Sequence, residues 1–202
     1  MVGKLFLETE RLVLREFTID DLDLIIELDS DPEVKRYIDN GAPVDRAESL
    51  EMLEWWLGYY DRAAGYGFWA AFERATERFI GWFHFRPGEH ATSPTTAGLE
   101  PELGYRLRRE SWGQGYATEG SKALIDKGFQ ELGIVRAYAE TMAINVGSRR
   151  VMEKAGMRLV RSFVSDWPVR IPGDEAGDVE YAIDRAQWDA ARGDQPGLIR
   201  PA

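Results

Sequence analysis

The chain has no cysteine among its 202 residues. Disulfide bonds, thiolate metal ligands and a cysteinyl acyl intermediate are therefore excluded, so any acyl transfer must be direct or use another nucleophile. Histidine is scarce as well: His84 and His90 are the only two, and their spacing suggests no metal site. We interpret them as a strand residue and a loop residue, and we expect no metal centre.

Long apolar runs are also missing. Residues 1–7 include a lysine and too few apolar side chains for a signal peptide. No other stretch approaches the roughly 18 uninterrupted apolar residues that a membrane-spanning helix needs. We therefore expect a cytoplasmic protein with no membrane partner.

Positive charge is in deficit. The formal net charge of -10 at pH 7 disfavours nonspecific nucleic-acid binding, which depends on releasing counterions from phosphates, and suits a cationic ligand better. Basic residues nevertheless gather at two places, before a glycine-rich turn and after Asn145: Arg106, Arg108, Arg109, Arg149, Arg150 and Lys154. A polyanion can be held locally there, although no nucleic-acid partner is expected.

The length and the 44% apolar content favour one domain with one core, which we place at residues 1–192, followed by a tail at 193–202. Hydrophobic periodicity and turn residues predict four helices, within 19–28, 45–63, 115–132 and 147–155. They predict seven strands, at 11–17, 67–73, 78–85, 102–107, 134–142, 157–165 and 178–183, of which the second and third form a hairpin. This order indicates an α/β (α+β) domain with a mixed sheet and helices on its faces.

The most informative segment is residues 112–119, with the sequence WGQGYATE, between a predicted strand and a predicted helix. Gly113 and Gly115 allow a tight turn and a close approach of ligand to backbone. The first amides of the helix stay unpaired and, with the helix dipole, attract phosphate. The alternative is a simple turn before a helix.

Two other phosphate-binding patterns fit this segment poorly. The dinucleotide-binding pattern requires a third Gly or Ala where Thr118 stands. A P-loop requires Gly-Lys-Ser/Thr, whereas Gly120 is followed by Ser121 and Lys122 in reversed order. A dinucleotide-binding enzyme therefore ranks third among our hypotheses.

At this point the sequence resembles the GNAT acetyltransferase superfamily, in particular the branch of ribosomal-protein N-acetyltransferases. The resemblance covers nearly the whole chain and depends on LETERL at 7–12, ELGY at 102–105, WGQGYATE at 112–119 and NVGSRRVMEKAGM at 145–157. It implies a single GNAT-type domain with a central mixed, mostly antiparallel, twisted sheet of about seven strands and about four flanking helices. It also implies acetyl-CoA as the co-substrate.

The resemblance assigns main-chain amides around Gly113, Gly115, Tyr116 and Ala117 to the pyrophosphate of coenzyme A. Glu110 departs from the family signature, which has Gln or Arg at that position. The outer phosphates fall to Arg108 and Arg109, for which plain solvation is the alternative. The full set of expected cofactor-binding residues is Tyr105, Leu107, Arg108, Arg109, Trp112, Gly113, Gln114, Gly115, Tyr116, Ala117, Thr118, Asn145, Ser148 and Arg150.

Strand 102–107 is expected to lie beside the pantetheine arm of the co-substrate. Glu102 and Gly104 share one face of this strand, opposite the face of Leu103 and Tyr105. An alkyl ammonium with a pKa near 10 costs roughly 4 kcal/mol to deprotonate at pH 7, so a base or a water chain must help. The resemblance makes Glu102 the candidate base, and an exposed strand-edge carboxylate is the alternative.

Three further residues are candidates for the chemistry. By resemblance, Asn145 hydrogen-bonds the pantetheine region and Ser148 donates to the departing sulfur, while Tyr138 is a lesser candidate acid. The structural alternative is that Asn145 caps the following helix and that Ser148 is only a first-turn residue.

The resemblance places the acceptor cleft beside the helices between the first two strands, where an acidic run at 20–33 precedes the aromatic group Trp55, Trp56, Tyr59 and Tyr60. Cation attraction and aromatic packing suit a protonated amine, although a solvent coat and a core are the simpler interpretation. The leading hypothesis is acetyl transfer from acetyl-CoA to a primary amine by direct attack in a ternary complex, with a protein N-terminal α-amine first. A small-molecule amine (polyamine, aminoglycoside or amino acid), a non-catalytic acyl-CoA-binding module and a homodimer are left open.

Overall fold

The computed structural model describes residues 3–39, 41–88, 98–165 and 170–193. His90, most of the loop predicted at 86–98, and the predicted tail beyond residue 193 lie outside these residues. In the described part of the chain, no helix has the length and apolarity required to cross a membrane.

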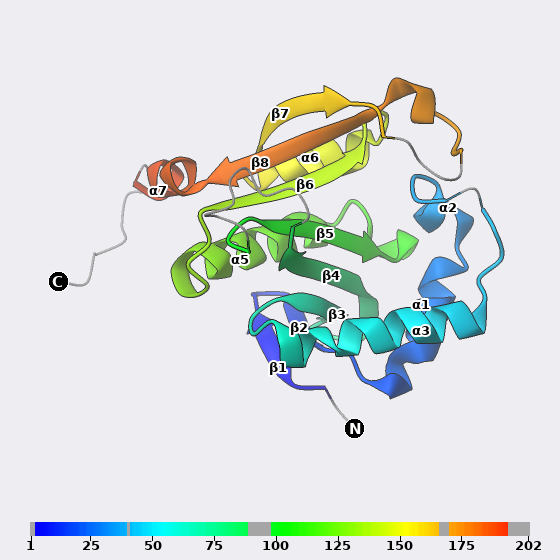
Figure 1. Cartoon of the computed structure of the whole chain (residues 1–202). Helices are drawn as coiled ribbons and strands as arrows, with labels where there is room; N and C mark the ends of the chain where they lie inside the picture. Colours follow the sequence, from blue (N-terminus) through cyan, green and yellow to red (C-terminus); the bar gives the residue numbers. More distant parts are fainter. Residues whose placement is uncertain (1–2, 40, 89–97, 166–169, 194–202) are drawn as a thin grey trace.

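One mixed sheet organises the chain, in the order β1-β2-β3-β4-β5-β6-β8-β7 (Figure 1). Every neighbouring pair is antiparallel except β5 and β6, which are parallel. The strands are β1 Leu5–Glu8, β2 Leu12–Glu16, β3 Gly67–Glu73, β4 Phe79–Pro87, β5 Pro101–Leu107, β6 Arg136–Met142, β7 Arg158–Phe163 and β8 Asp178–Asp184. The mixed, mostly antiparallel sheet is confirmed, with eight strands instead of about seven; β1, only four residues long, is the addition.

The four predicted helices are present as α1 Leu22–Asp29, α3 Arg46–Leu57, α5 Tyr116–Glu131 and α6 Val146–Lys154. The described residues add two single-turn helices, α2 Pro32–Lys35 and α4 Tyr59–Arg62, and α7 Arg185–Gly193 after β8. The helix expected within 45–63 is interrupted at Gly58, where α3 ends and α4 begins. Thr18 lies at the N-cap of a short 3-10 helix, Ile19–Asp21, which leads into α1.

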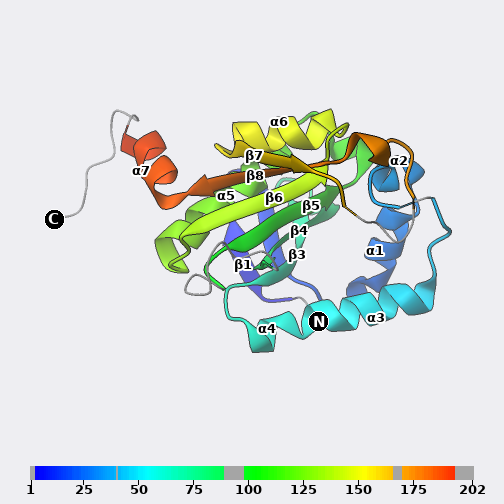
Figure 2. The ribbon, with the colours of Figure 1, turned by 45° about the horizontal axis from the view of Figure 1, so that its top comes forward.

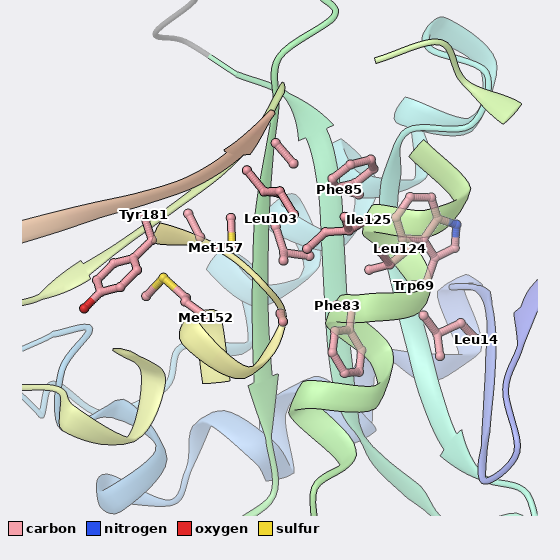
Figure 3. Packing of buried hydrophobic residues seen from close by; sticks show 14 of the residues in the cluster. Leu14, Trp69, Phe83, Phe85, Leu103, Leu124, Ile125, Met152, Met157 and Tyr181 are labelled. Carbon is pink, nitrogen blue, oxygen red and sulfur yellow. The ribbon is translucent and has the colours of Figure 1, made fainter. Parts of the chain in front are cut away.

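The helices divide between the two faces of the sheet, so the domain has two cores (Figure 2). On one face, α5 and α6 cover side chains such as Phe83, Leu103 and Tyr181 (Figure 3). On the other face, α1 and α3 cover β3 and β4 through a second cluster that includes Trp56 and Phe68. Alternate side chains of a strand therefore enter different environments.

The sheet opens between β5 and β6. β4 is in register with the whole of β5, from Gly81 opposite Leu107 to Pro87 opposite Pro101. In contrast, β5 and β6 are in register at a single position, Glu102 opposite Tyr138. The main-chain groups of β5 beyond Glu102 therefore lack a regular ladder on this side.

Candidate active site

The glycine turn that precedes α5 presents main-chain amides. Gly113 and Gly115 have φ values of 72° and 87°, in the left-handed region that glycine favours. Gly115 is the N-cap of α5, and no side chain caps this end of the helix. A Cβ built on Gly113 would meet no atom within 4 Å, so the space over the turn is open. Because a helix start carries about +0.5 of a charge, the turn can bind a phosphate.

The segment before β2 clamps this turn from the other end of the chain. Thr9 Oγ1 donates to Glu119 Oε1 at 2.5 Å, and the Arg11 main-chain amide donates to the same oxygen at 2.9 Å. The Arg11 guanidinium donates to Glu119 Oε2 at 2.7 Å and to the Gln114 carbonyl at 2.9 Å. Burial raises the pKa of the Glu119 carboxyl, but the bonds from Thr9 and Arg11 outweigh burial and hold this pKa below its ordinary value. The LETERL and WGQGYATE segments are thus joined by direct contact.

A cavity of about 430 Å³ adjoins the turn. Its walls combine the start of α5, the end of α6 and the segment before β2, and its lining residues are Glu10, Arg11, Gly115, Thr118, Glu119, Lys122 and Lys154. The lining combines three cations with two carboxylates, and Arg11 is paired with Glu119. Lys122 and Lys154 therefore supply the positive charge that can attract an anion larger than a single phosphate.

Arg108 and Arg109, the two arginines expected at the outer phosphates, do not line this cavity. Arg108 forms a two-pronged ion pair with Glu27 of α1, with both N–O distances at 2.7 Å. This hydrogen bonding raises the pKa of Arg108 and lowers the pKa of Glu27. Arg108 and Arg109 line a different cavity, of about 200 Å³, together with α1 and α2 residues. Their role at the co-substrate stays a prediction, and the geometry ties Arg108 to α1.

The remaining turn residues are held by local contacts. Trp112 is 46% exposed, and its Nε1 donates to the Leu107 carbonyl at 2.8 Å. Gln114 Nε2 donates to the Glu110 carbonyl at 2.7 Å. The Tyr116 hydroxyl donates to Glu73 of β3, and its ring lies 4.7 Å from the Arg11 guanidinium carbon. The turn is therefore rigidly placed between β5 and α5.

The start of α6 contacts β5 near the place where the sheet opens between β5 and β6. Asn145 Oδ1 accepts from the Ser148 amide at 3.1 Å, which confirms the structural interpretation that Asn145 caps α6. The Tyr105 hydroxyl, from β5, donates to Ser148 Oγ at 3.2 Å. Burial raises the pKa of Tyr105 to about 12, so this hydroxyl keeps its proton. Arg150 is exposed on the same helix.

The candidate base lies on the other face of β5. Glu102 Oε2 accepts from Arg86 of β4 at 2.6 Å, and Glu102 Oε1 lies 3.7 Å from His84 Nε2. Burial lowers the pKa of His84, Glu102 acts in the opposite direction, and the cations of Arg86 and Arg106 reinforce the lowering. A carboxylate, an imidazole and a guanidinium thus share one side of the sheet.

The two candidate acids are on opposite faces. Ala137 and Ala139 belong to the core under α5 and α6, so Tyr138 between them points to the face of Glu102. Tyr138 is 1% exposed, and a Cβ on Gly88 would lie 2.6 Å from its hydroxyl oxygen, which shows how closely that segment packs. Ser148 instead belongs to the helix that covers the opposite face. Both roles stay predictions, and the Tyr105 bond gives Ser148 the more defined setting.

The acidic and aromatic residues near α1 and α3 are mostly structural. Asp29 pairs with Arg106 at 2.5 Å. Trp56 is 2% exposed and stacks on Phe68, with ring centroids 4.5 Å apart. Trp55 differs, because 46% of it is exposed. The simpler interpretation of a core is therefore confirmed for Trp56, and Trp55 is left as a surface aromatic.

Sequence reasoning missed two groups. His84 is the strand residue that was predicted, in β4, but its neighbours Glu102 and Arg86 make it part of the site. The alternation of polar residues in the sequence HFR at 84–86 was the available signal. Lys122 was weighed only as a P-loop lysine, yet it lies one helical turn from Thr118 and lines the cavity beside Gly115.

The comparisons with known proteins agree with this geometry. The model of the "Acetyltransferase (GNAT) domain" matches residues 11–158. The FsC-acetyl coenzyme A-N(2)-transacetylase of Aspergillus fumigatus is 33% identical over 195 residues, which are 96% of this chain and 81% of that protein. The uncharacterized N-acetyltransferase YoaA of Bacillus subtilis is 30% identical over 156 residues, 75% of this chain and 82% of that protein.

Solved structures share the fold. An acetyltransferase of the GNAT family from Bacillus anthracis superposes with a TM-score of 0.69 at 25% identity, covering 89% of this chain and 98% of that one. RimL, a ribosomal L7/L12 alpha-N-protein acetyltransferase solved in complex with coenzyme A, superposes with a TM-score of 0.73 at 18% identity, covering 90% and 98%. At this identity the second likeness concerns the fold alone.

Proposed function

The chain belongs to the GNAT acetyltransferase family and is an acetyl-CoA-dependent N-acetyltransferase; from that premise we propose that its acceptor is a small-molecule primary amine. The acetyl group passes by direct attack in a ternary complex. The absence of cysteine supports the direct route, because no thiol is present to carry the acetyl group covalently.

The observation that carries the acetyl-CoA part of the proposal is the opening of the sheet between β5 and β6. An extended pantetheine arm fits such an opening, because the free main-chain groups of β5 can pair with its amides as with an added strand. The bare start of α5 lies where β5 leads into the turn, and it suits the pyrophosphate. Lys122 and Lys154, which line the adjoining cavity, suit the outer phosphate, whereas Arg11 is paired with Glu119.

On the face of β5 that points away from α5 and α6, Glu102 takes the proton from the acceptor ammonium. The neutral nitrogen then attacks the acetyl carbonyl carbon, and a main-chain amide of β5 stabilises the negative charge on the carbonyl oxygen. The attacking nitrogen of the tetrahedral intermediate then gives its second proton to water, the C–S bond breaks as the amide forms, and the thiolate leaves. Positioning of the two reactants supplies most of the acceleration.

Ser148 assists the departing sulfur in this proposal. Its oxygen accepts a hydrogen bond from Tyr105, so its own proton is left to point toward another acceptor. A thiolate has a conjugate acid with a pKa of about 8.5, and one hydrogen bond is sufficient help at neutral pH. Ser148 therefore donates a bond without giving up its proton.

The small-molecule acceptor rests on the fungal relative, whose name specifies an N(2)-transacetylase of FsC. That relative matches 96% of this chain, so the acceptor side of the domain is included in the likeness. The protein N-terminal α-amine, expected from the sequence, stays a prediction, because RimL resembles this chain at 18% identity only.

Release of free thiol from acetyl-CoA tests the proposal, and the chain itself adds no thiol background because it lacks cysteine. The panel contains amino-acid amides, polyamines, aminoglycosides and peptides with a free N-terminus. We expect thiol release with one of the small amines and a product heavier by one acetyl group. Turnover of peptides alone would overturn the small-molecule acceptor. Acetyl-CoA binding without turnover of any amine would leave the non-catalytic module as the better hypothesis.

A further inference from the structure

The imidazole of His84 lies directly over β5. In the register of β4 and β5, His84 is opposite Gly104, and a Cβ on Gly104 would come within 2.4 Å of the ring carbon Cε1. The ring also packs against Phe68 and Trp82, with centroid distances of 5.2 Å and 5.9 Å. Gly104 thus leaves the space that brings this ring beside Glu102.

Packing alone does not account for a histidine at this position. Both ring nitrogens are buried: Nε2 lies 3.7 Å from Glu102 Oε1, longer than a formed hydrogen bond, and Nδ1 has no hydrogen-bond partner among the described residues. A buried polar atom without a partner destabilises the folded state, so a phenylalanine would fill the same space at lower cost. Such an atom calls for a functional explanation.

The charges around His84 favour a neutral ring that can accept a proton. The charged groups that face it are Glu102 and Arg106 of β5 and Arg86 of its own strand, and Arg106 is in turn paired with Asp29 of α1. The aromatic neighbours from β3 and β4 carry no charge. Burial and the two arginines disfavour the imidazolium, and among the described residues the carboxylate of Glu102 stabilises it.

We propose that His84 is a positioning residue for Glu102, receiving at Nε2 the proton that Glu102 takes from the acceptor ammonium. This inference rests on the proposed function. In the first step an N–H bond of the ammonium breaks and an O–H bond forms on Glu102. In the second step this O–H bond breaks and an N–H bond forms on His84, which regenerates the carboxylate beside an imidazolium. The proton passes to water when the product leaves.

A mutant cycle tests this relay by steady-state kinetics with acetyl-CoA and the amine identified in the panel. His84→Phe keeps an aromatic ring and removes both nitrogens. We expect kcat to fall about 10- to 100-fold, with KM for acetyl-CoA unchanged and with the acidic limb of the pH profile displaced. In the Glu102→Gln background the same change should have almost no further effect, because the relay is already broken. Full activity of His84→Phe would overturn the relay. A double variant whose loss of kcat equals the product of the two single losses would overturn it as well.

A second test, titration of the histidine ring signals by NMR spectroscopy, does not depend on activity. The chain has two histidines, so His90→Gln assigns the ring signals of His84 by elimination. We expect the His84 signal of the full chain to titrate below the ordinary pKa range of histidine, and Glu102→Gln to lower its pKa further. An unchanged pKa in Glu102→Gln would show that the two groups are not coupled, and the relay would fail.

The two proposals fail in different ways. If the wild-type chain acetylates no amine, the proposed function fails, and the titration still reports whether His84 and Glu102 are coupled. If the wild type is active, the titration is uncoupled and His84→Phe retains full kcat, only the relay fails. Circular dichroism of His84→Phe confirms that a loss of rate is not a loss of fold.

Discussion

The glycine turn before α5 and the Glu102 face of β5 are built from different material. The turn offers main-chain amides and two glycines with positive φ, and side chains such as Arg11 only hold it in place. The face of β5 offers side chains, with Glu102 set between Arg86 and His84 from a neighbouring strand. The comparison teaches that binding of acetyl-CoA and proton transfer depend on different residues in this domain. Mutations should therefore change the affinity for acetyl-CoA and kcat separately.

The largest effect is expected from Glu102→Gln. The amide keeps the shape of the side chain but cannot take a proton, so kcat should fall about 100- to 10,000-fold. The dissociation constant for acetyl-CoA, measured by calorimetry, should stay unchanged because the turn is untouched. Glu140→Gln, on the same side of the sheet in β6, is the matched control and should change kcat about twofold at most. Equal losses in both variants would contradict a specific role of Glu102.

The converse change is Gly115→Ala, which should weaken acetyl-CoA binding about 10- to 100-fold. A side chain at φ 87° is strained, and its Cβ intrudes where the pyrophosphate is expected. The nearest atom to this Cβ is Arg11 Nη2 at 3.4 Å, so the free protein has room for it.

Gly133→Ala is the control for this change, because Gly133 also has a positive φ, 68°, but lies just beyond the other end of α5. It should lower the melting temperature without altering affinity. Equal loss of affinity in the two glycine variants would mean that helix strain, and not the turn, controls binding.

A smaller effect is expected where the two regions meet. Tyr105→Phe removes the bond to Ser148 across the gap, and we expect kcat to fall about 5- to 10-fold, in line with one neutral hydrogen bond. Ser148→Ala should reduce kcat at least as much, and the double variant should be no worse than Ser148→Ala alone. Additive losses, measured by thiol release under saturation, would show that Tyr105 does not act through Ser148.

The smallest effect on catalysis, and a clear one on stability, is expected for Glu119→Gln. Loss of its charge-assisted bonds to Thr9 and Arg11 should lower the unfolding free energy by about 1.5–3 kcal/mol at pH 7. Since the folded-state pKa of Glu119 is lowered, this contribution is complete above the ordinary pKa of 4.5 and is lost as the pH falls through the folded-state pKa. Urea unfolding at pH 7 and below pH 4 measures the difference between variant and wild type. A difference that persists at the lower pH would contradict the ionic origin.

The contrast between the two regions also explains what the sequence revealed. Glycines that require a positive φ and a bare helix start leave a local signature, so the spacing within residues 112–119 predicts a turn that can bind phosphate, and the family resemblance then assigns the amides around residues 113–117 to the pyrophosphate. The alternation of β5 placed Glu102 and Gly104 on one face. Periodicity gives a face but not a register, and His84 meets Glu102 only through the pairing of β4 with β5. The ion pair of Arg108 with Glu27 joins residues far apart in the chain, and no local pattern predicts it.

The fold, like the site, was predictable only where a local sequence pattern marks the element. Long periodic segments such as α5 were located within a residue or two. The strand β1 has four residues, too few for alternation to be distinguished from chance. The helix α7 begins directly after β8, and its signal was available but not used: Asp184 accepts from the Gln187 amide, and Gln187 accepts from the Asp184 amide, as in a capping box.

The clamp between Thr9 and Glu119 spans 110 residues of chain. Closing so wide a loop costs conformational entropy and, in two-state folding, such distant contacts slow the search for the native state. The first turn of α5 acquires its bonds to Thr9 and Arg11 only when the amino-terminal segment has docked. A ligand of that turn therefore acts on folding too: at saturating concentration acetyl-CoA should select the docked arrangement and shield the amino-terminal segment from proteases.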